Sequence, residues 1–214
     1  MTETHTISTT VHGRYLVEAA GVGAPLLVGF HGYGQSAEQL LEDLRCVPGA
    51  AGWTLVAIQA LHRFYSPKTR DVVGSWMTSQ DRDLAIQDNL AYIRRVLTEL
   101  RIDQGGGPLV FAGFSQGAVM AWRAAAHCGP CAGLMVLGGD LPQDVAEAPD
   151  LTLPPVLLGR GNQDPLYTAS QLENDLAALA ARGRKAEVVA FEGGHAWAPG
   201  FLGAAGSFLA ALRS

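Results

Sequence analysis

The chain has few cysteines, no cluster of basic residues and no long apolar run, and each shortage excludes a class of protein. Three cysteines in 214 residues are too few for a disulfide-stabilised scaffold. The 15 Lys and Arg residues are scattered and outnumbered by 20 Asp and Glu residues, so the net charge of −5 argues against a nucleic-acid partner. No apolar segment is long enough to span a bilayer, and we therefore expect no membrane insertion.

The first ten residues, from Met1 to Thr10, lack both the basic region and the apolar stretch of a signal peptide. We therefore expect a cytoplasmic protein. The length, with no internal repeat, linker or low-complexity segment, predicts one domain over residues 1–214. The sequence leaves the oligomeric state open, a homodimer included.

Two of the three cysteines, Cys128 and Cys131, have the C-x-x-C spacing of a redox motif. Redox pairs of this kind lie at the start of a helix, whose dipole lowers the thiol pKa. Here the pair follows a predicted helix and precedes the predicted strand 133–138, so we interpret it as a turn and leave open whether the two cysteines pair. A zinc site would need more ligands, and we expect no metal.

Apolar runs that predict strands alternate with amphipathic stretches that predict helices. Capping boxes at Ser36 and Thr168 mark the starts of two helices. Strands are expected at 14–19, 25–31, 53–58, 133–138, 155–161 and 185–191, with a further strand beginning at 109, and an irregular stretch is expected at about 59–78. Strands separated by helices predict an α/β fold, with a mostly parallel central sheet covered by helices on both faces. Chemistry in such sheets gathers at the carboxyl ends of the strands.

A serine stands between two glycines where the strand beginning at Leu109 meets a helix, in the sequence Gly113-Phe114-Ser115-Gln116-Gly117. This is the G-x-S-x-G pattern of a nucleophile elbow. Side chains at Gly113 or Gly117 would collide with neighbouring backbone in so tight a turn, and the serine is pushed outward. The helix start behind Ser115 favours the negative charge of an acyl-transfer intermediate.

A serine nucleophile needs a base and a third group that orients the base. His195 is the predicted base, because it follows the last strand in a glycine-rich loop. Asp164 and Asp140 both follow strands between the serine and the histidine, and either satisfies the order Ser, Asp, His. We favour Asp164, because Pro165 and the neighbouring turn residues fix its carboxylate. Asp140 is assigned a turn or capping role.

Acyl transfer also needs backbone N–H groups that bind the developing oxyanion. One is expected from Gln116, the residue after the nucleophile. The loop His31-Gly32-Tyr33-Gly34 follows a strand, and its glycines allow close backbone approach, so the second donor is expected from Tyr33. His31 is interpreted as a structural support for this loop.

Together, His31-Gly32-x-Gly34, the Gly-Phe-Ser-Gln-Gly elbow, Gly161-x-x-Asp164 and Gly193-Gly194-His195 resemble the α/β-hydrolase superfamily. The elbow and the small size are similar to the phospholipase/carboxylesterase group, which includes acyl-protein thioesterases and bacterial carboxylesterases. The resemblance implies an α/β-hydrolase sheet, carries over the triad, and supports the oxyanion pair. The stretch from Arg63 to Met77 matches the thioesterases only loosely, around Trp76, so the resemblance does not extend to an acyl-protein substrate.

The predicted function is therefore hydrolysis of small uncharged esters or thioesters through an acyl-enzyme, without a cofactor. Residues 141–154 are too few for a cap domain, so the pocket is expected to be shallow and walled by residues 61–77. Five side chains are candidate substrate contacts, each of which could instead pin its loop to the core: Phe64, Tyr65, Trp76, Met77 and Trp197.

Three other functions stay open on the sequence alone. An acyltransferase would use the same intermediate with an alcohol acceptor, and a peptidase could use the same fold. A binding module could have kept the fold without catalysis. The acyl and alcohol groups of the substrate are not identified.

Overall fold

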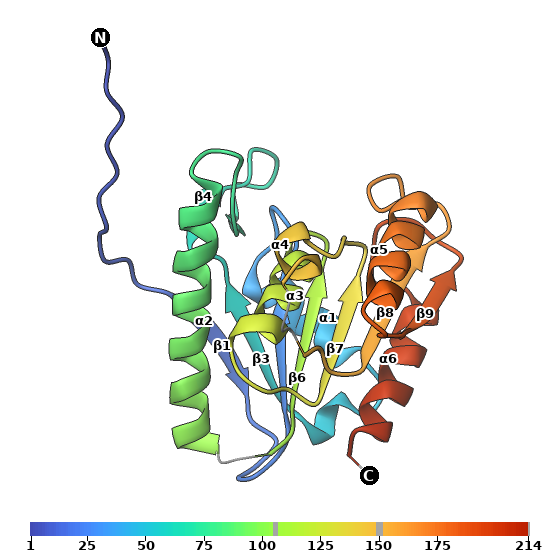
Figure 1. The fold of residues 1–214 in the computed structure, drawn as a ribbon. Coiled ribbons are helices and arrows are strands. Elements are labelled where there is room, and N and C mark those ends of the chain that lie inside the picture. Colours follow the sequence, from blue (N-terminus) through green and yellow to red (C-terminus); the bar gives the residue numbers. More distant parts are fainter. Residues whose placement is uncertain (105–106, 149–151, 214) are drawn as a thin grey trace.

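The computed structural model describes residues 1–104, 107–148 and 152–213. These residues form a seven-stranded sheet in the order β1-β3-β2-β6-β7-β8-β9, in which only β1 is antiparallel to its neighbour. The strands of this sheet are β1 (Arg14–Glu18), β2 (Leu26–Phe30), β3 (Thr54–Gln59), β6 (Leu109–Phe114), β7 (Gly133–Leu137), β8 (Val156–Gly161) and β9 (Ala186–Phe191). The parallel strands all point to one edge, at the top of Figure 1.

Helices cover both faces of the sheet, as predicted. They are α1 (Ala37–Arg45), α2 (Arg82–Gln104), α3 (Gln116–His127), α4 (Gln143–Ala146), α5 (Ala169–Ala181) and α6 (Pro199–Ala211), with a short 3₁₀ turn, η1 (Ala50–Gly52). Both predicted capping boxes are present, at Ser36 before α1 and at Thr168 before α5. In each, the cap side chain accepts from a backbone N–H of the first turn, which otherwise has no partner.

Two apolar cores follow from the alternation of side chains along the strands. In β2, Val28 faces one side and Leu27 the other, and both are fully buried. The first core packs α2, α3 and α5 against the sheet, and the second packs α1 and α6 against the opposite face. Figure 1 shows these two helical layers in front of and behind the strands. Burial on both faces explains why the interior strands read as unbroken apolar runs.

The region predicted to be irregular, residues 59–78, contains a hairpin. Strands β4 (His62–Tyr65) and β5 (Val72–Ser75) pair antiparallel, outside the main sheet. An isolated bridge between Gln35 and Gly74 joins this hairpin to the loop after β2. The hairpin therefore lies at the edge where the parallel strands end, and it projects above the sheet in Figure 1.

The connection from β7 to β8 holds only the short helix α4 among its described residues. The C-x-x-C pair lies where the sequence placed it: Cys128 ends α3, and Cys131 precedes β7. Neither forms a disulfide. Burial raises the pKa of both thiols to about 11, which keeps them protonated and unreactive at neutral pH.

Candidate active site

The nucleophile elbow is the tight turn between β6 and α3, and its crowding is visible in the backbone. Ser115 has φ 55° and ψ −122°, a conformation that L-residues rarely adopt. A Cβ atom at Gly113 would lie 2.3 Å from the carbonyl oxygen of Gly117, and one at Gly117 would lie 2.0 Å from that of Phe30. Only glycine fits at both positions. Strain of this kind costs about 1–3 kcal/mol and persists only where the surrounding structure imposes it.

The predicted base and acid are joined by a short hydrogen bond. His195 Nδ1 lies 2.7 Å from Asp164 Oδ2. With Nδ1–H donated to the carboxylate, the neutral ring leaves Nε2 as a proton acceptor. Nε2 is buried and has no hydrogen-bond partner among the described residues, so it is free to take a proton from another group.

Two glycines after β7 bring the histidine loop close to the elbow. A Cβ atom at Gly138 would lie 3.0 Å from the His195 ring, and one at Gly139 would lie 2.5 Å from the Ser115 carbonyl oxygen. The ring of Phe114, the residue before the serine, lies 4.7 Å from the His195 ring, measured between centroids. His195 therefore lies close to the elbow.

Asp164 is held by its own turn. Its Oδ1 accepts from the backbone N–H groups of Leu166 at 2.8 Å and Tyr167 at 3.0 Å, which leaves Oδ2 for His195. Burial alone would raise the pKa of Asp164, but these N–H groups and the His195 side chain outweigh it, and the pKa is lowered. The carboxylate is therefore ionised at neutral pH.

The structure brings Asp164 to His195 and leaves Asp140 apart. Asp140 is exposed, and its carboxylate accepts a long hydrogen bond, 3.4 Å, from the Gln171 side chain.

The two expected oxyanion donors, the backbone N–H groups of Tyr33 and Gln116, have no acceptor among the described residues. Gln116 opens α3, where the first N–H groups of a helix have no intrahelical partner. The loop that carries Tyr33 lies against Ser115, since a Cβ atom at Gly32 would be 3.3 Å from Ser115 Cβ. Both donors are thus available beside the serine.

His31 supports this loop from inside the protein. The ring is fully buried, Nε2 accepts from the Ala60 N–H at 3.0 Å, and Nδ1 therefore donates to the Gly32 carbonyl at 2.8 Å. Burial lowers the pKa of His31, so the ring is neutral at pH 7. Gln59 adds a hydrogen bond to the ring at 3.1 Å.

The side chain of Gln116 makes contacts that the sequence did not reveal. Its Oε1 accepts from the Trp76 N–H at 2.8 Å, and its Nε2 donates to the Met77 carbonyl at 2.8 Å. The residue beside the nucleophile therefore ties the end of the β4–β5 hairpin to the elbow. The motif alone could not indicate this, because the partners lie about 40 residues earlier in the chain.

The five candidate substrate contacts lie in three places: the core, the loop after β9, and the β4–β5 hairpin. Trp76 and Met77 lie in the core, where the Trp76 indole packs on Phe30 and donates to the His31 carbonyl, so their placement favours a structural role. Trp197 is half-buried against the rings of Phe114 and Phe201.

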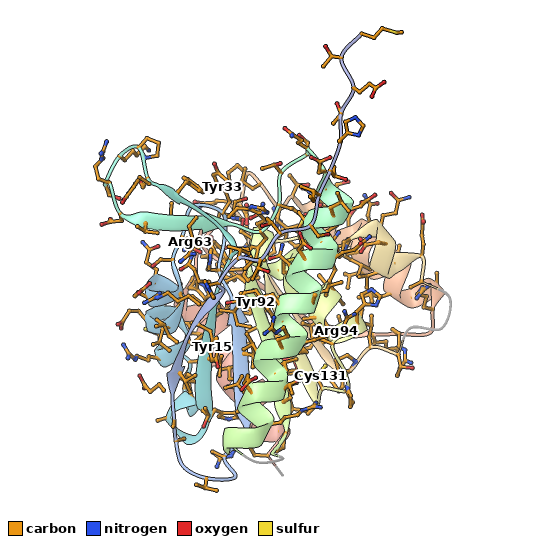
Figure 2. The ribbon with its side chains drawn as sticks, turned by 90° about the vertical axis from the view of Figure 1, so that its left-hand side faces the viewer. Tyr15, Tyr33, Arg63, Tyr92, Arg94 and Cys131 are labelled. Atoms are coloured by element: carbon orange, nitrogen blue, oxygen red, sulfur yellow. The ribbon has the colours of Figure 1, made fainter. Side chains whose placement is uncertain are left out.

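Phe64 and Tyr65 belong to the projecting hairpin. Phe64 packs against Tyr33 with ring centroids 5.6 Å apart and ring planes tilted by 33°, and Tyr65 is exposed with the Arg70 guanidinium over its ring. Figure 2 places Tyr33 and Arg63 where this hairpin leaves the body of the molecule. The Phe64 ring therefore borders the loop after β2 that carries Tyr33.

Within the described residues, no group of three or more His, Cys, Asp or Glu side chains is placed to hold a metal ion. In the same part of the chain, no helix combines the length and apolarity needed to cross a membrane.

The fold is that of an α/β-hydrolase, and the loops that carry Ser115, Asp164 and His195 follow one another along the chain in the order of that class. Comparisons with known proteins agree. Residues 15–213 match the model of the phospholipase/carboxylesterase family. The chain belongs to this family and is a serine hydrolase of the carboxylesterase or thioesterase type, which confirms the resemblance seen in the sequence.

Solved structures give the same fold. Esterase PE8 is 26% identical, with a TM-score of 0.72, over 94% of this chain and 98% of its own. Zea mays acyl-protein thioesterase 2 is 19% identical, with a TM-score of 0.77, over 95% of this chain and 100% of its own. A Bacillus cereus carboxylesterase is 14% identical, with a TM-score of 0.71, over 94% of each chain. A search of curated protein sequences found no match.

Proposed function

We propose that this hydrolase cleaves small uncharged carboxylic esters or thioesters through an acyl-enzyme on Ser115, with His195 as base and Asp164 as orienting acid. The observation that carries the proposal is the 2.7 Å hydrogen bond between His195 Nδ1 and Asp164 Oδ2, made in loops that converge on a strained serine. The bond leaves Nε2, the nitrogen that a serine base needs, as the open acceptor.

The chemistry follows from these positions. His195 Nε2 takes the Ser115 proton as Oγ attacks the substrate carbonyl, and the tetrahedral oxyanion is bound by the N–H groups of Tyr33 and Gln116. The protonated ring then gives its proton to the leaving alcohol or thiol, and the acyl group stays on Ser115. Water, activated by the same ring, attacks the acyl-enzyme and releases the acid.

Asp164 serves both steps without changing its own charge. Its lowered pKa keeps it ionised, so it holds the neutral ring in the Nδ1–H tautomer and stabilises the imidazolium that forms. The mechanism uses only side chains and backbone groups of this chain, and we propose that no metal or cofactor is required.

The substrate class is inferred from the wall of the site. The rings of Tyr33 and Phe64, which pack against each other, and the exposed ring of Tyr65 present apolar surface near the loop after β2 that carries Tyr33. The rings favour an acyl or alcohol group without charge. Tyr33, Phe64, Tyr65 and Trp197 are the side chains we propose to contact it.

Replacing Ser115 with alanine tests the proposed function. We expect Ser115→Ala to lose turnover of a p-nitrophenyl ester by about 10⁶-fold, the scale found when a triad serine is removed. The matched control is Ser207→Ala, because Ser207 is an exposed serine on α6 that only donates to the Gly203 carbonyl. Circular dichroism and thermal unfolding verify that both variants are folded. Full activity in Ser115→Ala would exclude the assignment.

A further inference from the structure

Asp175, on α5, is a buried acid that the proposed mechanism does not use. It is 7% exposed, and no cation pairs with its carboxylate among the described residues. A buried carboxylate without a cation is costly, because the charge has lost its hydration. The burial of this carboxylate is explained by the two loops that it hydrogen-bonds.

Both hydrogen bonds of Asp175 go to loops beside the active site. Oδ2 accepts from the Tyr167 hydroxyl at 2.7 Å and from the Leu141 N–H at 3.0 Å. Tyr167 belongs to the loop after β8, and Leu141 to the loop after β7. One oxygen atom of α5 therefore joins the two loops.

The loop after β8 carries the acid of the proposed triad. Tyr167 is fully buried, and its backbone N–H donates to Asp164 Oδ1 at 3.0 Å. Its carbonyl accepts from Arg160 Nε at 2.9 Å. The hydrogen bond from the Tyr167 hydroxyl to Asp175 is a third contact that fixes Tyr167. The position of the Tyr167 N–H, which orients Asp164, therefore depends on Asp175.

The loop after β7 lies against the base. Three residues before Leu141, Gly138 has φ +64° and leaves room for the His195 ring, which a Cβ atom there would meet at 3.0 Å. A shift of this loop would press on His195. The two contacts of Asp175 thus reach the loop that orients Asp164 and the loop that lies against His195.

We propose that Asp175 is a positioning residue: its buried carboxylate holds together the two loops that carry and flank the acid and base of the active site. The proposal rests on the proposed function, because it concerns the geometry of the same triad.

The charge on Asp175 determines how strongly it holds the loops. Burial raises its pKa to about 6, against the hydrogen bonds from Tyr167 and Leu141, and the nearby charge of Asp140 adds to the rise. Arg160 also lies close enough to act on the Tyr167 hydroxyl. Asp175 is therefore ionised above about pH 6 and accepts charge-assisted hydrogen bonds there, which weaken when it is protonated.

The same shift fixes the sign of the effect on stability. An acid whose folded pKa is raised disfavours folding when it is ionised, so the cost of Asp175 is present above about pH 6 and is gone below the ordinary pKa of an aspartate. The neutral variant Asp175→Asn avoids this cost. It is expected to be no less stable than the wild type at pH 7.5.

The test compares Asp175→Asn and Tyr167→Phe with the wild type, using p-nitrophenyl ester hydrolysis from pH 5 to pH 8. Above pH 7 we expect kcat to fall about tenfold in Asp175→Asn, since small misplacements of catalytic groups have effects up to about a hundredfold. KM should change by less than about twofold, because Asp175 does not touch the substrate. The ratio of wild-type to Asp175→Asn kcat should shrink toward one as the pH falls through about 6.

Tyr167→Phe removes the hydroxyl but keeps the backbone N–H, and it should also lower kcat. In the double variant the two losses should not multiply, because both variants disturb the same hydrogen bond between Tyr167 and Asp175. Asp43→Asn is the matched control: burial likewise raises the pKa of Asp43 to about 6, but it lies on α1, on the other face of the sheet. Its kcat and pH profile should equal those of the wild type.

Wild-type kcat in both Asp175→Asn and Tyr167→Phe would overturn the inference, and so would a kcat ratio that does not change with pH. If Ser115→Ala is inactive while these variants are normal, only the positioning role fails. If Ser115→Ala keeps its activity, the proposed function itself fails.

Discussion

At the scale of single residues, Asp164 and Asp140 show how far side-chain chemistry alone can be read from a sequence. Both are aspartates just past a strand, in the correct order between Ser115 and His195. The turn residues around Asp164 favoured it, and in the structure that turn supplies two N–H groups to one oxygen and leaves the other facing His195. Asp140 lacks this arrangement and faces solvent.

Asp164→Asn and Asp140→Asn, measured side by side, test this assignment. Asp164→Asn should lower kcat by about 10⁴-fold, the loss known for a triad whose acid becomes an amide and stabilises the wrong tautomer. Asp140→Asn should stay within about twofold of the wild type, as expected for an exposed side chain. The measurement is steady-state hydrolysis of a p-nitrophenyl ester at pH 7.5. Equal losses in the two variants would contradict the assignment.

Other residue roles could not be predicted, because they depend on partners distant in the chain. The sequence left Trp76 as either a substrate contact or a core residue; in the structure it is fully buried, and its ring packs against Phe30 of β2. Asp175 gave no signal at all, since an aspartate in a helix is usually exposed. It is buried where α5 meets the loops after β7 and β8, through the Leu141 N–H and the Tyr167 hydroxyl.

At the scale of elements, the strands were predictable and their partners were not. The run 25–31 predicted the strand that forms at Leu26–Phe30, because a strand buried on both faces leaves an unbroken apolar run. The pairing of β1 with β3 depends on contacts about 40 residues apart, which local patterns do not encode. The β4–β5 hairpin was missed because its strands are only four residues long and mix polar and apolar residues without clear alternation.

The attachment of that hairpin to the elbow yields a prediction at this scale. Gln116→Ala removes the side-chain groups that satisfy the Trp76 N–H and the Met77 carbonyl. The free energy of unfolding should fall by about 1–3 kcal/mol, the cost of leaving the buried Trp76 N–H without a partner, while the Met77 carbonyl keeps the Ser75 hydroxyl at 3.0 Å. Urea denaturation measures it, with Gln80→Ala as the control, because Gln80 is an exposed glutamine outside the helices. Unchanged stability in Gln116→Ala would show that the hairpin is held by other contacts.

At the scale of the whole molecule, the fold class was predictable because strands and helices alternate along the chain, and such order requires crossover connections. The family match over residues 15–213 and the solved relatives confirm this fold and the hydrolase class. The substrate could not be predicted in the same way. The rings that border the site come from the loop after β2 and from the hairpin, and only the folded chain brings them together.

The central claim is that an acyl group is carried by Ser115, and covalent labelling tests it most directly. A fluorophosphonate probe reacts with an activated serine, and mass spectrometry of the intact and digested protein locates the adduct. We predict one adduct, on Ser115, that is absent in Ser115→Ala, forms much more slowly in His195→Ala, and forms at the wild-type rate in Ser207→Ala. No labelling of an enzyme that turns over ester, or an adduct on another residue, would contradict the account.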